Sequence, residues 1–102
     1  MCAVSIAYAE AGQVRVGAVY CPFLEEFFHV IQGEGSYLNA QRLQITMQTE
    51  LRTALIGTGF PYNREERPKL IPKFQKMLEN CGDIRRIGAA SLDICWIAAG
   101  RI

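Results

Sequence analysis

Larger apolar side chains stand at every second position near the start of the chain. Over residues 3–9, Val4, Ile6 and Tyr8 alternate with small residues, and a similar alternation runs from 14 to 20. This period of two is typical of a β-strand. The segment 10–13 between them contains a glycine, which suits a tight turn. The pattern therefore predicts an antiparallel hairpin, which Pro22 ends because proline has no N–H to donate.

Further extended segments follow the hairpin. Residues 26–31 predict a third antiparallel strand, which Gly33-Glu34-Gly35 interrupts. Residues 37–39 and 43–45 are predicted to be short extended pieces on either side of another turn. The first part of the chain therefore favours an antiparallel sheet.

The periodicity changes in the second part of the chain. The apolar run 54–56, closed by Gly57-Thr58-Gly59, predicts a buried strand. Asn63, followed three residues later by Glu66, resembles a capping box. A helical stripe then predicts a helix that ends near Asn80-Cys81-Gly82; its members are Leu70, Ile71, Phe74, Met77 and Leu78.

Two prolines bear on the start of this helix. Pro68 fits an early helical turn, whereas Pro72 fits poorly because a proline inside a helix removes a hydrogen bond. The pattern therefore leaves open where the helix starts, or predicts a kink there.

The end of the chain is apolar almost throughout. Residues 83–87 predict a short strand, and residues 89–99 predict a helix that is apolar on every side. Such a helix must be buried on every side, so we expect its covering layers to lie outside these 102 residues. The order of elements indicates an α+β fold, or half of a layered α/β sandwich. Residues 1–102 are expected to form one segment, with antiparallel strands in 1–47 and strand–helix–strand–helix in 48–102.

Composition narrows the class of protein. The chain has 102 residues, of which 50% are hydrophobic and 21% charged, and its net charge is +1. These values indicate one globular domain and argue against a nucleic-acid-binding surface. No apolar stretch reaches the roughly 20 residues that a membrane span needs, and no signal peptide is evident, so we expect a cytoplasmic protein without a membrane partner. The four cysteines have long, irregular spacings, which favours buried reduced thiols over a metal site.

Several segments, in the same order, resemble the inositol monophosphatase family, most closely its bacterial branch. Residues 3–7 are similar to its Phe-Ala-Val-Ser-Ile strand, and 16–22 to its Val-Gly-Val-Val-Tyr-Asp-Pro strand. The segment 32–39 resembles its Arg-Gly-x-Gly-Ala-x-x-Asn-Gly turn. Residues 58–62 resemble Thr-Gly-Phe-Pro-Phe. The final segment, 85–101, resembles an Arg-Arg-x-Gly-Ser-Ala-Ala-Leu-Asp run that ends in Ala-Ala-Gly-Arg.

The resemblance implies a layered sandwich fold and a specific chemistry. The family hydrolyses inositol monophosphates with Mg²⁺ ions and a metal-activated water, and its enzymes are commonly homodimers. Its metal ligands are carboxylates on an early helix, on an Asp-Pro-Ile-Asp-Gly-Thr strand and on a late Trp-Asp. Hard Mg²⁺ prefers such oxygen ligands. The sequence contains none of these motifs, so we expect the family's N-terminal and C-terminal parts to be missing and this chain alone to be inactive, without tightly bound Mg²⁺.

One functional segment of the family has a counterpart here. The resemblance implies that Gly88, Ala89 and Ala90 contact the substrate, although Ala89 replaces the usual Ser or Thr. An ordinary strand-to-helix turn is the alternative. Arg85, with Arg86 beside it, is expected to position substrate or to pair across a dimer. A solvated basic pair is the alternative there.

The other chemistry-bearing residues favour structural roles. His29 has no acidic partner close in sequence, and neighbouring glutamates at 25–26 and 65–66 point apart, which disfavours a shared metal site. Asp93 is predicted to make a structural hydrogen bond near the site. Ser91 lacks the Gly-x-Ser-x-Gly pattern of a nucleophile, and Trp96 is predicted to be core.

Two functional alternatives to an inositol monophosphatase segment stay open. The first is a truncated, non-catalytic product that acts as a binding or dimerising module. The second is a phosphatase of the same superfamily that acts on fructose bisphosphate or on 3′-phosphonucleotides.

Overall fold

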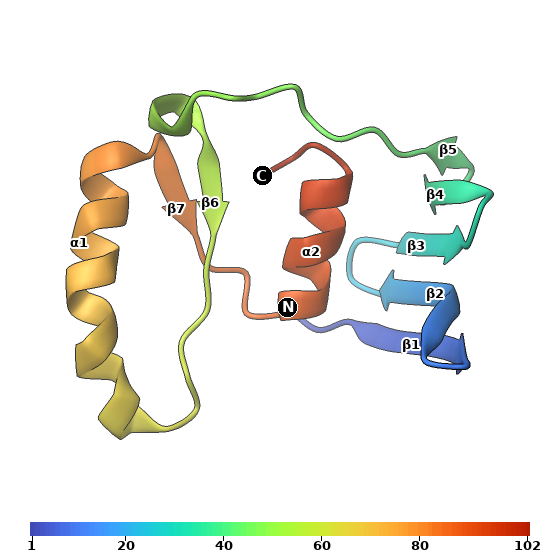
Figure 1. The fold of residues 1–102 in the computed structure, drawn as a ribbon, viewed down its shortest axis with the longest axis horizontal. Helices are drawn as coiled ribbons and strands as arrows, with labels where there is room; N and C mark the ends of the chain where they lie inside the picture. Colours follow the sequence, from blue (N-terminus) through green and yellow to red (C-terminus); the bar gives the residue numbers. More distant parts are fainter.

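The computed structural model describes all 102 residues. Its first part is a five-stranded antiparallel sheet in which each strand pairs with the next along the chain (Figure 1). The strands are β1 (Val4–Glu10), β2 (Gln13–Cys21), β3 (Glu26–Ile31), β4 (Gly35–Leu38) and β5 (Gln41–Arg42). The predicted hairpin and third strand are confirmed, and β2 ends directly before Pro22 as predicted.

The last strand of this sheet differs from the prediction. β5 pairs Gln41 and Arg42 with β4, whereas residues 43–45 were expected to be extended and lie outside any strand. Asn39 explains the difference, because its positive φ of 52° closes a two-residue turn and brings the chain back at once. Only Leu43 continues the pairing, through its N–H to the Ser36 carbonyl at 2.8 Å.

The strand register divides the side chains of the sheet between two faces. Paired residues share a face, and successive residues alternate. The outer face carries mostly apolar side chains and one charged side chain: Val4, Ile6, Tyr8, Val14, Val16, Ala18, Tyr20, Phe27, His29, Ile31, Tyr37 and Arg42. The inner face carries the alternate set, including Val19, Phe28 and Leu38, and it packs against the last helix.

The second part of the chain forms a separate parallel pair of strands. β6 (Leu55–Gly57) and β7 (Asp83–Arg85) are parallel neighbours, connected through the 3₁₀ segment η2 (Arg64–Leu70) and the helix α1 (Ile71–Asn80). A short 3₁₀ turn, η1 (Leu51–Thr53), precedes β6. The predicted strand and helix are both confirmed, but the strand is only half-buried.

The start of α1 shows how the two prolines are accommodated, and it corrects the predicted capping box. Pro72 lies in the first turn of α1, where its missing N–H costs no helical hydrogen bond, and Pro68 lies in η2. Asn63 caps η2 by accepting from the Glu65 N–H at 3.0 Å. No reciprocal bond from Glu66 forms, because the chain enters a 3₁₀ turn instead of an α-helix.

The helix α2 (Ala90–Ala98) lies between the sheet and the β6–β7 pair (Figure 1). The three buried residues of the chain are Cys21, Phe28 and Leu92, and they meet where α2 contacts the inner face. One side of α2 is uncovered, which agrees with the expectation that its covering layers lie outside these 102 residues. Ile94 is 68% exposed and Ile97 51%, because no element covers that side of the helix.

The cysteines and Trp96 only partly follow the prediction of buried positions. All four thiols are free, but only Cys21 is buried, Cys81 and Cys95 are half-buried, and Cys2 is exposed. Trp96 is half-buried beside the core. None of the helices combines the length and the apolar character that a bilayer crossing requires.

Candidate functional site

The junction between β7 and α2 brings two strand ends and a helix start together. Because β6 and β7 are parallel, their carboxyl ends lie at one edge, with Gly57 opposite Arg85. The Thr58 N–H donates to the Arg85 carbonyl at 2.9 Å and extends this pairing. Ligands of parallel sheets bind outside the carboxyl ends of the strands. This edge is therefore the candidate site.

Gly88 makes the turn from this edge into α2. Its φ is +87°, a left-handed conformation that side chains other than glycine rarely adopt. No atom lies within 4 Å of the position that a Cβ would take, so the backbone faces open space. Gly88 therefore allows the chain to change direction between β7 and α2, and it leaves room for a ligand at the start of the helix.

The first turn of α2 has free hydrogen-bond donors. Ala89 is the N-cap residue, and its methyl group cannot accept from the first N–H groups. Its carbonyl accepts from the N–H of Leu92 and Asp93, at 2.9 and 3.1 Å. Helix starts of this kind combine unpaired N–H groups with a positive dipole end, which suits anions and hydroxyl oxygens. The three predicted contact residues, 88–90, thus lie together at one helix start.

Asp93 lies one turn into α2, facing β6. A Cβ at Gly57 would lie 3.8 Å from the Asp93 Oδ1 and 2.9 Å from the Ile102 side chain. Gly57 thus allows β6 to approach the helix closely. Oδ1 of Asp93 is buried and has no hydrogen-bond partner, so the predicted structural hydrogen bond is absent for this atom.

Arg85 and Arg86 are engaged away from the helix start. Arg85 Nη1 lies 2.5 Å from the Asp83 Oδ2 and donates to the Ile84 carbonyl at 3.1 Å. Arg85, together with the Ile84 N–H, holds the pKa of Asp83 below its usual value. The Arg86 guanidinium lies 4.9 Å from the centre of the Phe60 ring. A role for Arg85 in substrate binding stays a prediction.

A cluster of Glu26, Trp96 and Arg101 joins the sheet to the end of α2. Glu26 accepts from Arg101 Nη1 at 2.6 Å and from Trp96 Nε1 at 3.2 Å. The guanidinium also lies 5.6 Å from the Trp96 ring centre. Because the partners are 70 and 75 positions apart, sequence reasoning missed this cluster. The only signal was the Ala-Ala-Gly-Arg match at the end of the chain.

His29 is held in the sheet as a structural residue. Its ring stacks between Phe27 and Tyr37, with centroid distances of 5.2 and 5.4 Å. Its Nε2 lies 3.1 Å from the Asn39 carbonyl. His29 lies on the outer face, whereas α2 packs against the inner face of the sheet.

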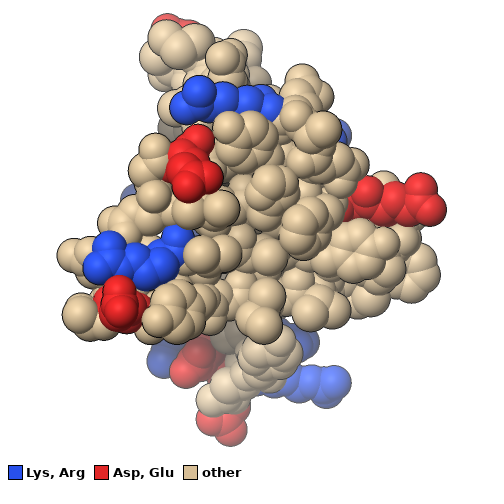
Figure 2. Space-filling view, turned by 90° about the vertical axis from the view of Figure 1, so that its right-hand side faces the viewer, with Lys and Arg blue, Asp and Glu red and all other residues tan.

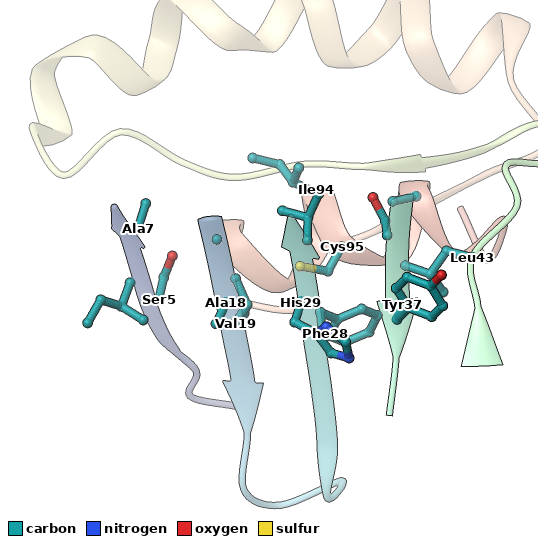
Figure 3. A pocket seen from close by; sticks show the side chains of 15 residues that line it. Ser5, Ala7, Ala18, Val19, Phe28, His29, Tyr37, Leu43, Ile94 and Cys95 are labelled. Carbon is teal, nitrogen blue, oxygen red and sulfur yellow. The ribbon is translucent and has the colours of Figure 1, made fainter. Parts of the chain in front are cut away.

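An apolar groove of about 230 Å³ runs between the inner face and α2 (Figure 3). Ile94 and Cys95 of the helix and residues of β1 to β4 line it. Burial, with the charge of Glu26 as a second cause, raises the pKa of the Cys95 thiol. The groove therefore offers apolar packing surface, with its one thiol kept protonated near neutral pH.

The carboxylates of the chain do not fit a Mg²⁺ site. Mg²⁺ needs several oxygen ligands in a near-octahedral arrangement. No group of three or more His, Cys, Asp or Glu side chains is close enough to hold a metal ion. Glu26 is paired with Arg101, Asp83 is paired with Arg85, and Asp93 stands alone.

Comparison with known proteins agrees with the layered fold. The model of the inositol monophosphatase family matches residues 1–102. The chain belongs to the inositol monophosphatase family. It is 37% identical over 100 residues to the Nus factor SuhB of Pasteurella multocida, and 37% over 101 residues to that of Escherichia coli K12. It covers 38% of the length of each of these relatives, and they cover 97% and 98% of this chain.

Solved structures of the family share the fold. Mycobacterium tuberculosis SuhB is 36% identical, with a TM-score of 0.91, and the match covers 98% of this chain and 42% of that one. The inositol monophosphatase of Anabaena is 34% identical, with a TM-score of 0.90 and the same coverage. The chain therefore has the inositol monophosphatase fold over about two-fifths of the length of these relatives, as the resemblance predicted.

Proposed function

We propose that this chain forms scaffold and one wall of the substrate site in a Mg²⁺-dependent phosphatase, which hydrolyses inositol monophosphate to inositol and phosphate. Family membership supports the reaction class. The observation that carries the proposal is the junction at Gly88. There a positive φ, open space and an uncapped helix start occur in the segment for which the family resemblance implies a substrate contact.

The contribution of this chain is binding. The N–H groups of Ala90 and Ser91 stand at the positive end of α2, where they can donate to a hydroxyl or phosphate oxygen. Ala89 contributes a methyl group, which removes one hydroxyl contact that a Ser or Thr would make. One proposed role of Arg85 is to join this site once its ion pair with Asp83 opens. The other is to lie with Arg86 at the interface of a homodimer, which we propose to be cytoplasmic. The metal ligands that hydrolysis requires would come from residues beyond these 102.

A chimera tests this proposal. The matching segment of the Anabaena inositol monophosphatase is replaced by residues 1–102, and Mg²⁺-dependent phosphate release is measured. Gly88→Ala is compared with Gly33→Ala, since both glycines have φ +87° and open space around them. We expect Gly88→Ala to raise the KM for inositol monophosphate several-fold and Gly33→Ala to leave it unchanged. Equal effects of the two changes on KM would contradict the proposed contact.

A substrate panel on the same chimera separates the related phosphatases. Two Staphylococcus aureus structures, each 29% identical to this chain, are described with inositol monophosphate and with 2′AMP bound. The panel therefore includes both compounds, together with fructose bisphosphate and a 3′-phosphonucleotide. Faster release from any of the last three than from inositol monophosphate would reassign the substrate.

A second candidate is a non-catalytic binding module. The Pasteurella and Escherichia relatives are called Nus factors, a name that denotes no hydrolase. The coding sequence around the gene discriminates between the two. An in-frame Asp-Pro-Ile-Asp-Gly-Thr upstream supports the phosphatase, whereas a ribosome-binding site directly before Met1 supports the separate module.

A further inference from the structure

Positive charge is concentrated on the α1 side of the molecule, away from the five-stranded sheet. Seen from the side of the sheet, uncharged side chains fill the middle of the view and charged ones lie around its margin (Figure 2). Beyond α2, on the far side from the sheet (Figure 1), η2 and α1 contain five of the 11 Lys and Arg residues: Arg64, Arg67, Lys69, Lys73 and Lys76. Neither Arg64 nor Arg67 forms a salt bridge within the chain. These two guanidinium groups are therefore free to bind an anion.

Both arginines line a pocket of about 490 Å³ between the loop after β6 and the start of α1. The other walls of this pocket are apolar and come from Phe60, Pro68, Leu70, Ile71 and Phe74. No acidic side chain lines it. Small-molecule sites of this size combine mainly apolar walls with a few polar groups that fix the orientation of the ligand. The pocket has this composition, and its polar groups are cations.

The 3₁₀ form of η2 explains why the two arginines reach the same pocket. A 3₁₀-helix has three residues per turn, so residues three apart lie on one side of it. Arg64, Arg67 and Leu70 follow this spacing, and all three line the pocket. Glu65 and Glu66 take the other sides of η2, and neither lines the pocket. One row of η2 thus presents two guanidinium groups followed by an apolar side chain.

The apolar part of the pocket contains two aromatic rings. The ring centroids of Phe60 and Phe74 are 5.5 Å apart, and Phe60 is 47% exposed. The Arg86 guanidinium, which does not line the pocket, lies 4.9 Å from the centre of the Phe60 ring and adds a third positive charge nearby. Aromatic rings pack against one another in offset or edge-to-face arrangements. The pocket can therefore hold a ligand ring beside Phe60 and Phe74.

We propose that this pocket binds a small aromatic anion, which is a ring that carries a phosphate or carboxylate group. The planar guanidinium groups of Arg64 and Arg67 suit both oxyanions, because each can donate two parallel hydrogen bonds to them. The ring of the ligand packs against Phe60 and Phe74. None of the pocket residues belongs to the segment 88–90, so the proposal is independent of the proposed function.

Titration of the 102-residue chain with phenyl phosphate and with benzoate, without Mg²⁺ and followed by NMR, tests the proposal. We expect saturable binding of at least one of the two. Arg64→Gln and Arg67→Gln should each weaken it by up to roughly fivefold, and the double variant by roughly tenfold or more, because an exposed ion pair contributes a factor of this size. Both arginines are exposed, so the variants should keep the fold. The matched control is Arg52→Gln, at an exposed arginine of η1 that also lacks a salt bridge, and it should leave binding unchanged.

Two further comparisons separate the roles of the ring and of the charge. Inorganic phosphate lacks the ring and benzyl alcohol lacks the charge, so each should bind more weakly than phenyl phosphate. Phe60→Leu keeps an apolar side chain but removes the ring, and it should weaken the binding of phenyl phosphate more than that of inorganic phosphate.

Four results would overturn the proposal. The first is no saturable binding of either aromatic anion. The second is binding that Arg52→Gln weakens as much as the double variant does, which would indicate a general effect of charge. The third is binding that Gly88→Ala abolishes and the arginine variants leave unchanged, which would place the ligand at the start of α2. The fourth is loss of binding in the Mg²⁺-free chimera with the Anabaena enzyme, which would show that segments beyond these 102 residues cover the pocket.

Discussion

The five-stranded sheet and the β6–α1–β7 unit differ in how they are stabilised. The sheet contributes Cys21 and Phe28 to the buried cluster, and α2 contributes Leu92, whereas β6, α1 and β7 contribute no buried residue. The sheet pairs neighbouring segments through short turns. The β6–β7 pair instead joins segments that are 28 residues apart. The fold therefore depends on the sheet, while the candidate site lies at the end of the weaker unit.

The helix α2 connects these two regions. Its Leu92 anchors it to the inner face, and its first residues follow β7 and carry the candidate contact loop. A change in the anchor should therefore affect the whole molecule, whereas a change beside β7 should have a local effect. Four variants test this ranking.

The largest effect is expected for Leu92→Ala. Leu92 is fully buried, so truncation removes packing and leaves a cavity, which costs about 3–4 kcal/mol of the free energy of unfolding. That is a large fraction of the stability of a domain of this size. Urea unfolding followed by circular dichroism measures it. The control Ile94→Ala, at a residue that is 68% exposed, should change the free energy by no more than about 0.5 kcal/mol.

Glu26→Gln should have the next largest effect. It removes the charge that Arg101 Nη1 contacts at 2.6 Å, and we expect a loss of about 1–2 kcal/mol because the carboxylate is mostly buried while Arg101 is partly exposed. The change also removes the second cause that raises the pKa of Cys95. The pKa of the Cys95 thiol should therefore fall, and maleimide should label Cys95 faster because the thiolate is the reactive form. Glu25→Gln is the control, and an equal loss in both variants would argue against the cluster.

Arg86→Ala tests the β6–α1–β7 side. The Arg86 guanidinium lies over the Phe60 ring, and this contact contributes about 0.5–1 kcal/mol to stability at an exposed site. The Phe60 ring in turn packs against Phe74, with ring centroids 5.5 Å apart. Thermal unfolding should show a small decrease in stability. The nearby Arg67→Ala serves as the control. If Arg86→Ala destabilised the chain as much as Leu92→Ala, the two regions would not differ as described.

The smallest effect is expected at Asp83. In the folded chain Arg85 and the Ile84 N–H favour the carboxylate and lower the pKa of Asp83 from its usual value. A lowered folded pKa gives stability that is present above the unfolded pKa and is lost as the pH falls through the folded pKa. Asp83→Asn should therefore be slightly less stable than wild type at pH 7 and equal to it once the pH lies well below the folded pKa of Asp83. A difference that grew towards acid pH would contradict this sign.

Local patterns were sufficient to predict most elements of the fold. Alternation of side chains predicted the hairpin and β3, and the helical stripe predicted α1. The place of β5 was missed because it depends on one residue, Asn39, in a left-handed conformation. The uncovered side of α2 was expected, because a helix that is apolar on every side needs more cover than these 102 residues supply.

The candidate site could be predicted only through the family resemblance. The segment 88–90 shows no periodicity of its own. Only the structure shows that Gly88 has a positive φ. Contacts between distant residues, such as Glu26 with Trp96 and Arg101, follow from the packing of α2 on the sheet. Pattern reasoning on single segments cannot reach such contacts.

The central claim is that these 102 residues carry scaffold and a substrate wall without a metal site. Phosphate release from inositol monophosphate by the purified chain, with Mg²⁺ and with or without a chelator, tests it most directly. We expect no release above a protein-free control in either condition. Turnover that requires Mg²⁺ and stops on addition of the chelator would contradict it.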